Sequence, residues 1–140
     1  MASFNKFNSF VEALAEKKHD LGADTLKVLL TNAAPIATNT VTANLTEITA
    51  ANGYTAGGAT ASITSSSQTS GTYKLVLGDP ATWTAAGGTI GPFRYAVLYN
   101  DTATNDELIG WWDYGSSITL AIGESFAVDF DPSTGVLTIA

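Results

Sequence analysis

The sequence contains no cysteine, a single histidine and few charged side chains. Without cysteine the chain can form neither a disulfide framework nor a thiolate zinc site, so packing and hydrogen bonds must hold the fold. Its apolar runs are much shorter than the roughly 20 residues of a membrane span, and no basic segment leads into an apolar run and a small-residue cleavage site. We therefore expect a protein that binds no membrane and is made and folded in the cytoplasm.

Basic residues are scarce as well. Six Lys and Arg stand against 13 Asp and Glu, which gives a formal net charge of -7 and a sequence pI near 4.3. Binding to nucleic acid depends on clustered Lys and Arg that neutralise phosphates, and the six here are scattered. The composition therefore argues against a nucleic-acid-binding protein. The acidic residues either simply form a soluble surface or form a face that points outward from a particle.

What the chain does have is apolar and small polar residues. Of its 140 residues, 45% are hydrophobic, which is enough to build one core in a single domain spanning 1–140. The remaining polarity comes largely from Ser, Thr, Asn and Gly, which are typical of short strands and tight turns. This composition favours a mainly β protein.

The first 22 residues predict one amphipathic α-helix. Phe4, Phe7, Val11 and Leu14 recur at helical spacing, and the residues flanking this stripe suit the two ends of a helix. Ser3 is a candidate N-cap, Lys17 and Lys18 would occupy the last turn, and Gly22 would close the helix. The Phe-rich stripe either packs on its own domain or forms an arm that docks on a neighbour.

Alternating apolar and polar residues predict strands along the rest of the chain. Turn signals separate the strand-like runs at regular intervals, and these runs cover 25–31, 59–66, 72–77, 93–99, 108–114, 118–122, 124–130 and 136–139. The expected fold is an antiparallel β-sandwich or flattened barrel with one N-terminal α-helix. The segment 36–58 is expected to be a long loop, and it is a candidate contact with neighbouring subunits.

The stretch 91–114 predicts two strands that are apolar on both faces. In the first, Phe93 and Tyr99 would share a face with the odd-numbered residues between them, and in the second the adjacent Trp111 and Trp112 must point to opposite faces. One face fills the core, while the other needs a second sheet, the helix or another molecule. The three Trp could serve as core, as a subunit interface or as a platform for carbohydrate.

No residue pattern indicates catalysis. His19 has no serine on a Gly-x-Ser-x-Gly turn to activate, so a catalytic triad is not expected. The acid pairs Asp106 with Glu107 and Asp129 with Asp131 lie in or beside turns, where Asp normally accepts hydrogen bonds from its own backbone. We expect no enzyme activity and no cofactor.

The sequence contains no complete EF-hand or P-loop motif. The segment 129–135 alternates oxygen-bearing side chains but misplaces the glycine and lacks the terminal acid of an EF-hand, and the glycine pairs lack the Lys of a P-loop. A calcium ion near Asp101, Asn105 and Asp106 stays open as an alternative, because oxygen-rich turns suit a hard cation.

Three segments together resemble a family of small structural proteins of tailed bacteriophages and prophages, which includes capsid-decoration proteins. These segments are 3–11, 91–114 and 123–131, and the likeness spans nearly the whole chain. It lies in core and turn residues, with no catalytic signature. The resemblance implies a non-enzymatic virion protein.

The resemblance implies a decoration or cement protein on the capsid exterior, whose partners are the major capsid protein and further copies of itself. The residues expected to make these contacts are Trp112, Tyr114, Tyr54, Phe4 and Phe7. The alternative is a tail-associated or head-fibre module that binds a carbohydrate or receptor through exposed aromatic side chains.

Overall fold

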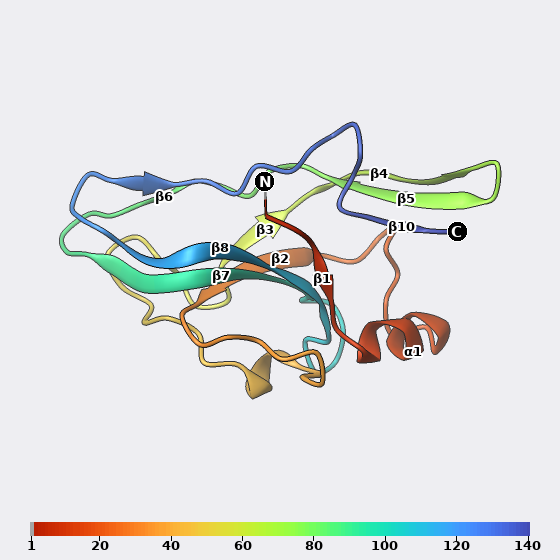
Figure 1. The fold of residues 1–140 in the computed structure, drawn as a ribbon, viewed down its shortest axis with the longest axis horizontal. Helices are drawn as coiled ribbons and strands as arrows, with labels where there is room; N and C mark the ends of the chain where they lie inside the picture. The colour runs from red at the N-terminus through yellow and green to blue at the C-terminus, as the bar shows by residue number, and fades with distance from the viewer. Residues whose placement is uncertain (1) are drawn as a thin grey trace.

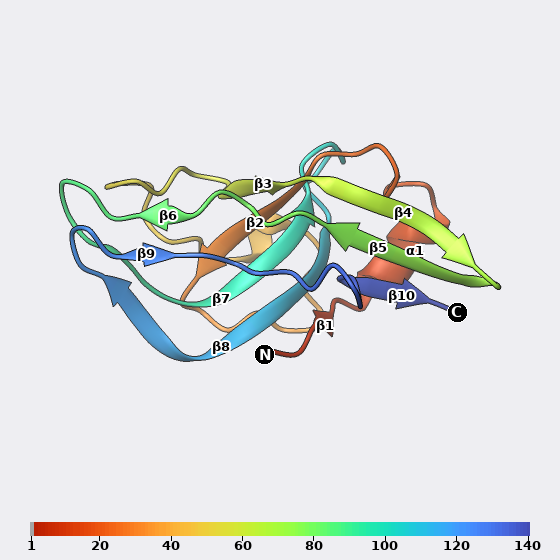
Figure 2. The same cartoon turned by 90° about the horizontal axis from the view of Figure 1, so that it is seen from above.

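Antiparallel strands dominate the structure, a computed structural model that describes residues 2–140 (Figures 1 and 2). A five-stranded sheet has the order β1-β8-β7-β2-β3, a three-stranded sheet the order β10-β5-β4, and a two-stranded sheet pairs β6 with β9. The strands are β1 (Asn5–Lys6), β2 (Leu26–Thr31), β3 (Ala59–Ala61), β4 (Ile63–Thr69), β5 (Thr72–Leu77), β6 (Trp83–Thr84), β7 (Ile90–Asn100), β8 (Leu108–Leu120), β9 (Ser125–Phe126) and β10 (Leu137–Ile139). The expected mainly β class with antiparallel strands is confirmed.

The large sheet is open at both ends. Among residues 2–140, β1 and β3 each pair with only one strand of this sheet, so the strands do not close into a ring. The expectation of a flattened barrel is therefore wrong. In the same residues no helix is long and apolar enough to cross a membrane.

The two smaller sheets lie over one face of the five-stranded sheet (Figures 1 and 2). The space between these layers is filled by a continuous cluster of buried side chains from both sides. Its members from the large sheet and from the smaller sheets include Leu26, Val28, Leu30, Leu98, Ile109, Leu75, Leu77, Trp83 and Leu137. Alternate residues of β2 supply one face, as the pleat of a strand requires.

The opposite face of the large sheet is also covered. Leu29, Val97 and Leu108 form a second buried cluster with Phe7 and Tyr99, against which Leu45 and Trp111 pack. The cover comes from the segment between β2 and β3, which runs below the sheet in Figure 1 and includes the short 3-10 helix η1 (Thr42–Asn44). The strands are apolar on both faces as expected, and the chain itself provides much of the second cover.

A shift of register in β7 changes which side chains share a face. The pairing of β7 with β8 is irregular between Phe93 and Tyr95, so the strict alternation of side chains breaks there. Phe93 joins the core with Leu98, while Val97 and Tyr99 lie on the other face. The prediction that Phe93 and Tyr99 share a face is wrong because of this irregularity.

The N-terminal helix is shorter than expected. Helix α1 (Ser9–Ala15) begins after Asn8 rather than after Ser3, because the preceding residues form β1 on the edge of β8. Phe4 and Phe7 are three residues apart, which is one face of a helix but opposite faces of a strand. They accordingly pack on opposite faces of the sheet: the partly buried Phe4 packs against the first cluster, and Phe7 belongs to the second.

The helix also ends earlier than Gly22. Lys17 adopts a left-handed backbone with φ 66°. Its N–H donates to the carbonyl of Leu14 at 3.3 Å, and the N–H of Lys18 donates to the carbonyl of Ala13 at 2.9 Å. These two bonds form a Schellman motif, in which glycine is the usual residue at the left-handed position. The helix packs on the domain through Phe10 and does not project as an arm.

Strands β4 and β5 form the expected hairpin, with a tighter turn than predicted. Thr69 pairs with Thr72, so only Ser70 and Gly71 connect the strands, and both have positive φ. This is the backbone of a type I′ turn, whose twist matches that of the strands. The hairpin tip projects from the body at the right of Figure 1.

Candidate functional site

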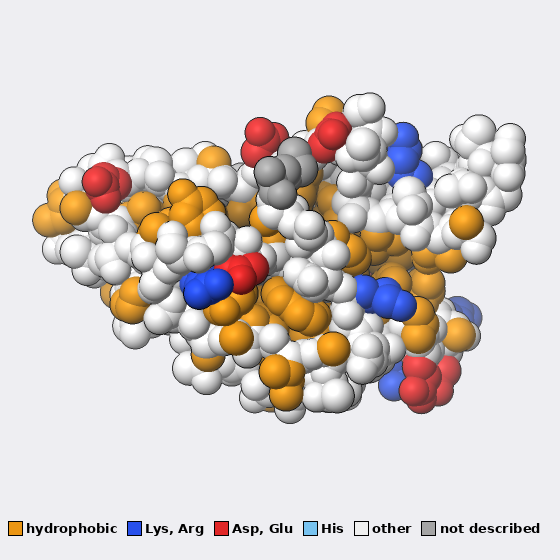
Figure 3. Space-filling model, viewed as in Figure 1, with side chains coloured by type: hydrophobic (Ala, Val, Ile, Leu, Met, Phe, Trp, Pro, Cys, Tyr) orange, Lys and Arg blue, Asp and Glu red, His pale blue; other side chains and the backbone are white. Residues whose placement is uncertain are grey.

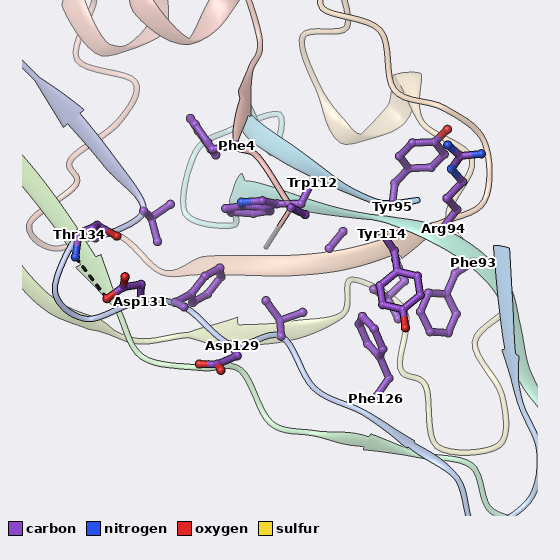
Figure 4. A pocket seen from close by; sticks show the side chains of 17 residues that line it. Phe4, Phe93, Arg94, Tyr95, Trp112, Tyr114, Phe126, Asp129, Asp131 and Thr134 are labelled. Carbon is purple, nitrogen blue, oxygen red and sulfur yellow. Dashed lines mark hydrogen bonds between the residues drawn. The ribbon is translucent and has the colours of Figure 1, made fainter. Parts of the chain in front are cut away.

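The principal candidate site is an aromatic groove between the large sheet and the chain that follows β9. It is a cavity of about 270 Å³, and we define it by the six aromatic side chains Phe4, Phe93, Trp112, Tyr114, Phe126 and Phe130. Trp112 and Tyr114 are two residues apart on β8 and so face the same side. Figure 4 shows Phe4 beside Trp112, and Phe93, Tyr114 and Phe126 grouped together.

The rings form two groups along the groove. At one end Trp112 lies between Phe4 and Phe130, with ring centroids 5.3 and 5.4 Å away. At the other end Phe126 contacts Phe93 and Tyr114 edge to face, at 4.9 and 5.9 Å. Such spacings are favourable for aromatic pairs, so the walls are held by their own contacts. Tyr114 is the most exposed of the six, with 57% of its surface accessible.

An ion pair stands beside the aromatic groove. Arg94 donates two hydrogen bonds to Asp113, from Nε to Oδ1 at 2.7 Å and from Nη2 to Oδ2 at 2.9 Å. These bonds hold the pKa of the Asp113 carboxyl below its usual value and raise the pKa of Arg94. The guanidinium also lies 5.4 Å from the ring centre of Tyr95. Arg94 therefore brings a positive charge that Asp113 already compensates.

Two further carboxylates line the aromatic groove, those of Asp129 and Asp131. Asp131 Oδ1 accepts hydrogen bonds from the backbone N–H of Ser133 at 2.7 Å and of Thr134 at 3.3 Å. These bonds lower the pKa of Asp131, so it is ionised at neutral pH. The turn role expected for this acid is confirmed, and Asp129 has an exposed side chain beside it.

The predicted contact residues fall into two sets. Trp112, Tyr114 and Phe4 come together in the aromatic groove, as described above. Phe7 and Tyr54 are instead buried, with 0% and 3% of their surface accessible. Neither can offer area to a partner of this folded chain, so their assignment as contact residues is wrong.

Tyr54 has a structural role. Its hydroxyl accepts a hydrogen bond from the N–H of Leu30 at 3.0 Å and donates to Glu47 Oε1 at 2.7 Å. The same Glu47 oxygen accepts from the N–H of Gly57 at 2.6 Å. Burial and the bond to Glu47 raise the pKa of Tyr54, so the phenol stays protonated. This network ties the long loop to β2.

His19 lies in a second polar cluster, beyond the end of the helix in which it was expected. Its ring is buried, and Nδ1 lies 3.1 Å from Nδ2 of Asn100. Asn100 Oδ1 accepts from the N–H of Thr102 and Ala103, so its amide nitrogen must face the ring and donate. Burial lowers the pKa of His19, which is therefore neutral with its proton on Nε2.

No catalytic arrangement surrounds this ring in residues 2–140. The hydrogen-bond partner of His19 is Asn100, and its Nε2 is buried without a partner in the described chain. Asn100 also donates to Asp24 at 2.7 Å, so the cluster holds the loop after β7 against the segment after α1. In residues 2–140 no hydroxyl forms a hydrogen bond with the imidazole.

The acidic turn after β7 was the open alternative for calcium. Asp101 forms an ion pair with Lys27 at 3.2 Å, and burial together with the nearby Asp101 and Glu107 raises the pKa of Asp106. Across residues 2–140 no group of three or more His, Asp or Glu side chains is placed to hold a metal ion. No observation in the structure supports calcium at this turn.

The sequence did not assign three of the six rings, Phe93, Phe126 and Phe130, to a contact surface. Phe126, Val128 and Phe130 alternate along the chain, which indicates one apolar face of a strand-like segment. That signal places the three on one face but cannot say which surface they meet. The contact with Trp112 and Phe93 depends on how the chain after β9 crosses the large sheet.

No family of proteins, no curated protein and no solved structure matches this chain.

Proposed function

We propose that this chain is a non-enzymatic structural protein of a tailed-bacteriophage virion that decorates the outer surface of the capsid and stabilises the shell. Its partners would be the major capsid protein and neighbouring copies of itself. We also infer that its two facing layers make it an antiparallel β-sandwich. The aromatic groove would be the attachment surface.

The observation that carries this proposal is the chemistry of the aromatic groove. Residues that dominate the binding energy of protein interfaces are enriched in Trp, Tyr and Arg, and here Trp112, Tyr114 and Arg94 lie together at an accessible cavity. The face shown in Figure 3 carries patches of hydrophobic side chains, with basic and acidic side chains beside them. Such a surface suits attachment to a protein, and the resemblance to virion proteins suggests which protein.

The function follows from mass action. A protein that binds only the assembled shell stabilises the shell against opening, and about 800 Å² of buried surface on each partner is enough for specific attachment. The net charge of -7 fits a position outside the shell, away from the packaged genome.

Add-back to particles that lack the protein tests the proposal. Purified wild-type chain should raise the temperature at which the particles release DNA, measured with a DNA-binding dye, in proportion to the bound copies counted by cryo-imaging. The variant Tyr114→Ala should bind and protect much less, because it removes an exposed ring of the groove. Ile122→Ala is the matched control, since Ile122 is 68% exposed but does not line the groove.

Three results would contradict the proposal: location only at the tail, unchanged rupture after removal of the protein, or full protection by Tyr114→Ala with folding confirmed by circular dichroism.

A second candidate is a binding module of the tail or a head fibre. The observation that favours it is the presence of Asp129 and Asp131 in the same groove as the rings, because flat rings and carboxylates suit the apolar faces and hydroxyls of a sugar. This function predicts that the wild-type chain binds host-cell envelopes and that Tyr114→Ala does not, with no binding of either to shells.

A further inference from the structure

We infer that the aromatic groove recognises a basic side chain, Lys or Arg, flanked by apolar residues of the shell protein. This inference rests on the proposed function, because it takes the groove to be the attachment surface. It adds the chemistry of the residue that is recognised.

The first argument is the arrangement of the rings. Phe4, Trp112 and Phe130 follow one another with centroid spacings of 5.3 and 5.4 Å, so three aromatic side chains border one end of the cavity. A cation over the face of an aromatic ring is attracted by the negative charge of the ring face, and Trp gives the strongest such interaction. Groups of rings around one cavity are the arrangement that binds ammonium and guanidinium groups.

The second argument is the charge of the aromatic groove. The one basic residue that lines it, Arg94, is held in two hydrogen bonds by Asp113 and is neutralised there. Asp129 and Asp131 line the opposite wall, which leaves an excess of negative charge. Lys74 does not line the groove. Its positive charge helps to lower the pKa of Asp131, and its Nζ donates a hydrogen bond to the carbonyl of Ser133 at 2.9 Å.

Asp129 is the carboxylate that remains available. Within residues 2–140 its side chain forms no hydrogen bond or ion pair. Because Asp129 alternates with Val128 and Phe130, which pack toward the rings, its exposed carboxylate lies at the outer rim of the groove (Figure 4). A basic side chain seated against Trp112 would bring its charge toward this rim, where opposite charges attract at low ionic strength. The rings and the carboxylate therefore favour the same kind of occupant.

The third argument is size. A cavity of about 270 Å³ is slightly smaller than the roughly 300–1,000 Å³ typical of small-molecule sites, so it suits one or two side chains. A second copy of this chain is a poor donor of the basic residue, because each copy has a net charge of -7. The shell protein is therefore the occupant that we propose.

Model peptides test this directly. The probes are acetyl-Thr-Leu-Arg-Leu-Thr-amide and the same peptide with citrulline, the neutral analogue of arginine, each titrated at millimolar concentration. The readout is the NMR signal of the indole N–H of Trp112, assigned with Trp112→Phe. We expect the arginine peptide to shift this signal and to bind about tenfold more tightly than the citrulline peptide, with weakening as salt is raised.

Carboxylate variants provide the second arm. Asp129→Asn with Asp131→Asn should weaken the arginine peptide about tenfold and leave the citrulline peptide unchanged. The control is Glu12→Gln with Glu16→Gln, which removes the same formal charge from exposed positions in α1 and at its C-cap, outside the groove, and should change binding less than twofold. The Asn at position 131 retains an oxygen acceptor for the turn.

Equal binding of the two peptides, no shift with either, or no effect of the Asn variants would overturn this inference. These results would leave the proposed function supported if the wild-type chain still protects particles and Tyr114→Ala does not. Failure of that add-back experiment, by contrast, would remove the proposed function whichever peptide binds.

Discussion

At the scale of single residues, the hydroxyl of Tyr54 joins β2 to the long loop through Leu30 and Glu47. Tyr54→Phe should lower the free energy of unfolding by about 1–3 kcal/mol, because it leaves the buried N–H of Leu30 without its partner and removes one of the two hydrogen bonds to Glu47 Oε1. Urea denaturation would measure this change. Tyr73→Phe is the control, since its hydroxyl bonds to Ser66 on a more exposed hairpin and should cost less. Equal losses from the two changes would contradict the buried role of Tyr54.

His19 predicts a dependence of stability on pH. Its pKa in the folded chain lies below the ordinary value of 6.5, because burial disfavours the charged ring. As pH falls through 6.5 the unfolded chain gains a proton that the folded chain does not, so the stability contributed by neutral His19 is present above 6.5 and is lost below it.

The variant His19→Gln isolates this effect, because glutamine does not titrate. The wild type should lose stability relative to the variant as pH falls from about 7 to about 5. The unfolding free energy of the wild type minus that of the variant should fall by at most about 1.4 kcal/mol per pH unit for one proton. Parallel curves for the two proteins over this range would show that His19 is not responsible.

At the scale of elements, Gly110 allows β1 to pair with β8 beside the aromatic groove. A Cβ at this position would lie 2.2 Å from Cε2 of Phe4 and 2.7 Å from the carbonyl oxygen of Asn5, so Phe4 and β1 would have to move. Gly110→Ala should therefore cost about 1–3 kcal/mol of stability and shift the NMR signals of Trp112, which packs on Phe4.

The control for this change is Ser116→Ala, an exposed position on the same strand, which should alter stability by no more than about 0.5 kcal/mol. A crystal structure or NMR data showing that Phe4 keeps its wild-type position in Gly110→Ala would contradict the close contact between Phe4 and Gly110.

The same elements show what the sequence can predict. Alternation in 93–99 and 108–114 correctly indicates buried strands, and adjacent positions on a strand place Trp111 and Trp112 on opposite faces, which the two buried clusters confirm. The sequence predicts a helix start after Ser3, which is wrong because Phe4 and Phe7 have helical spacing but flank the extended strand β1. That ambiguity is resolved only by the partner strand β8, which is distant in sequence.

The candidate site was less predictable than the fold. Trp112 and Tyr114 could be assigned to one side of a strand from their spacing, since strand residues two apart share a face. The rings that complete the groove come from Phe126 and Phe130, and their position depends on the path of the chain across the sheet. No local pattern encodes such a tertiary contact.

At the scale of the whole molecule, one buried cluster spans the large sheet and the smaller sheets, so we expect a single cooperative unit. Leu98→Ala on β7 and Leu75→Ala on β5 should each lower the unfolding free energy by about 2–5 kcal/mol, because both side chains are fully buried. Each should move one transition, with coincident curves from far-UV circular dichroism and Trp fluorescence. Separate transitions for the layers would contradict this expectation.

The turn of Ser70 and Gly71 at the tip of the β4–β5 hairpin is a site at which a short peptide could be inserted and displayed. A Cβ built on Gly71 meets no atom within 4 Å, and the tip lies away from the aromatic groove, so a short peptide inserted there would extend into solvent. Exposed tips built from small polar residues tolerate such insertions. An epitope in this turn would let antibodies report each copy of the protein without covering the surface through which it is proposed to attach.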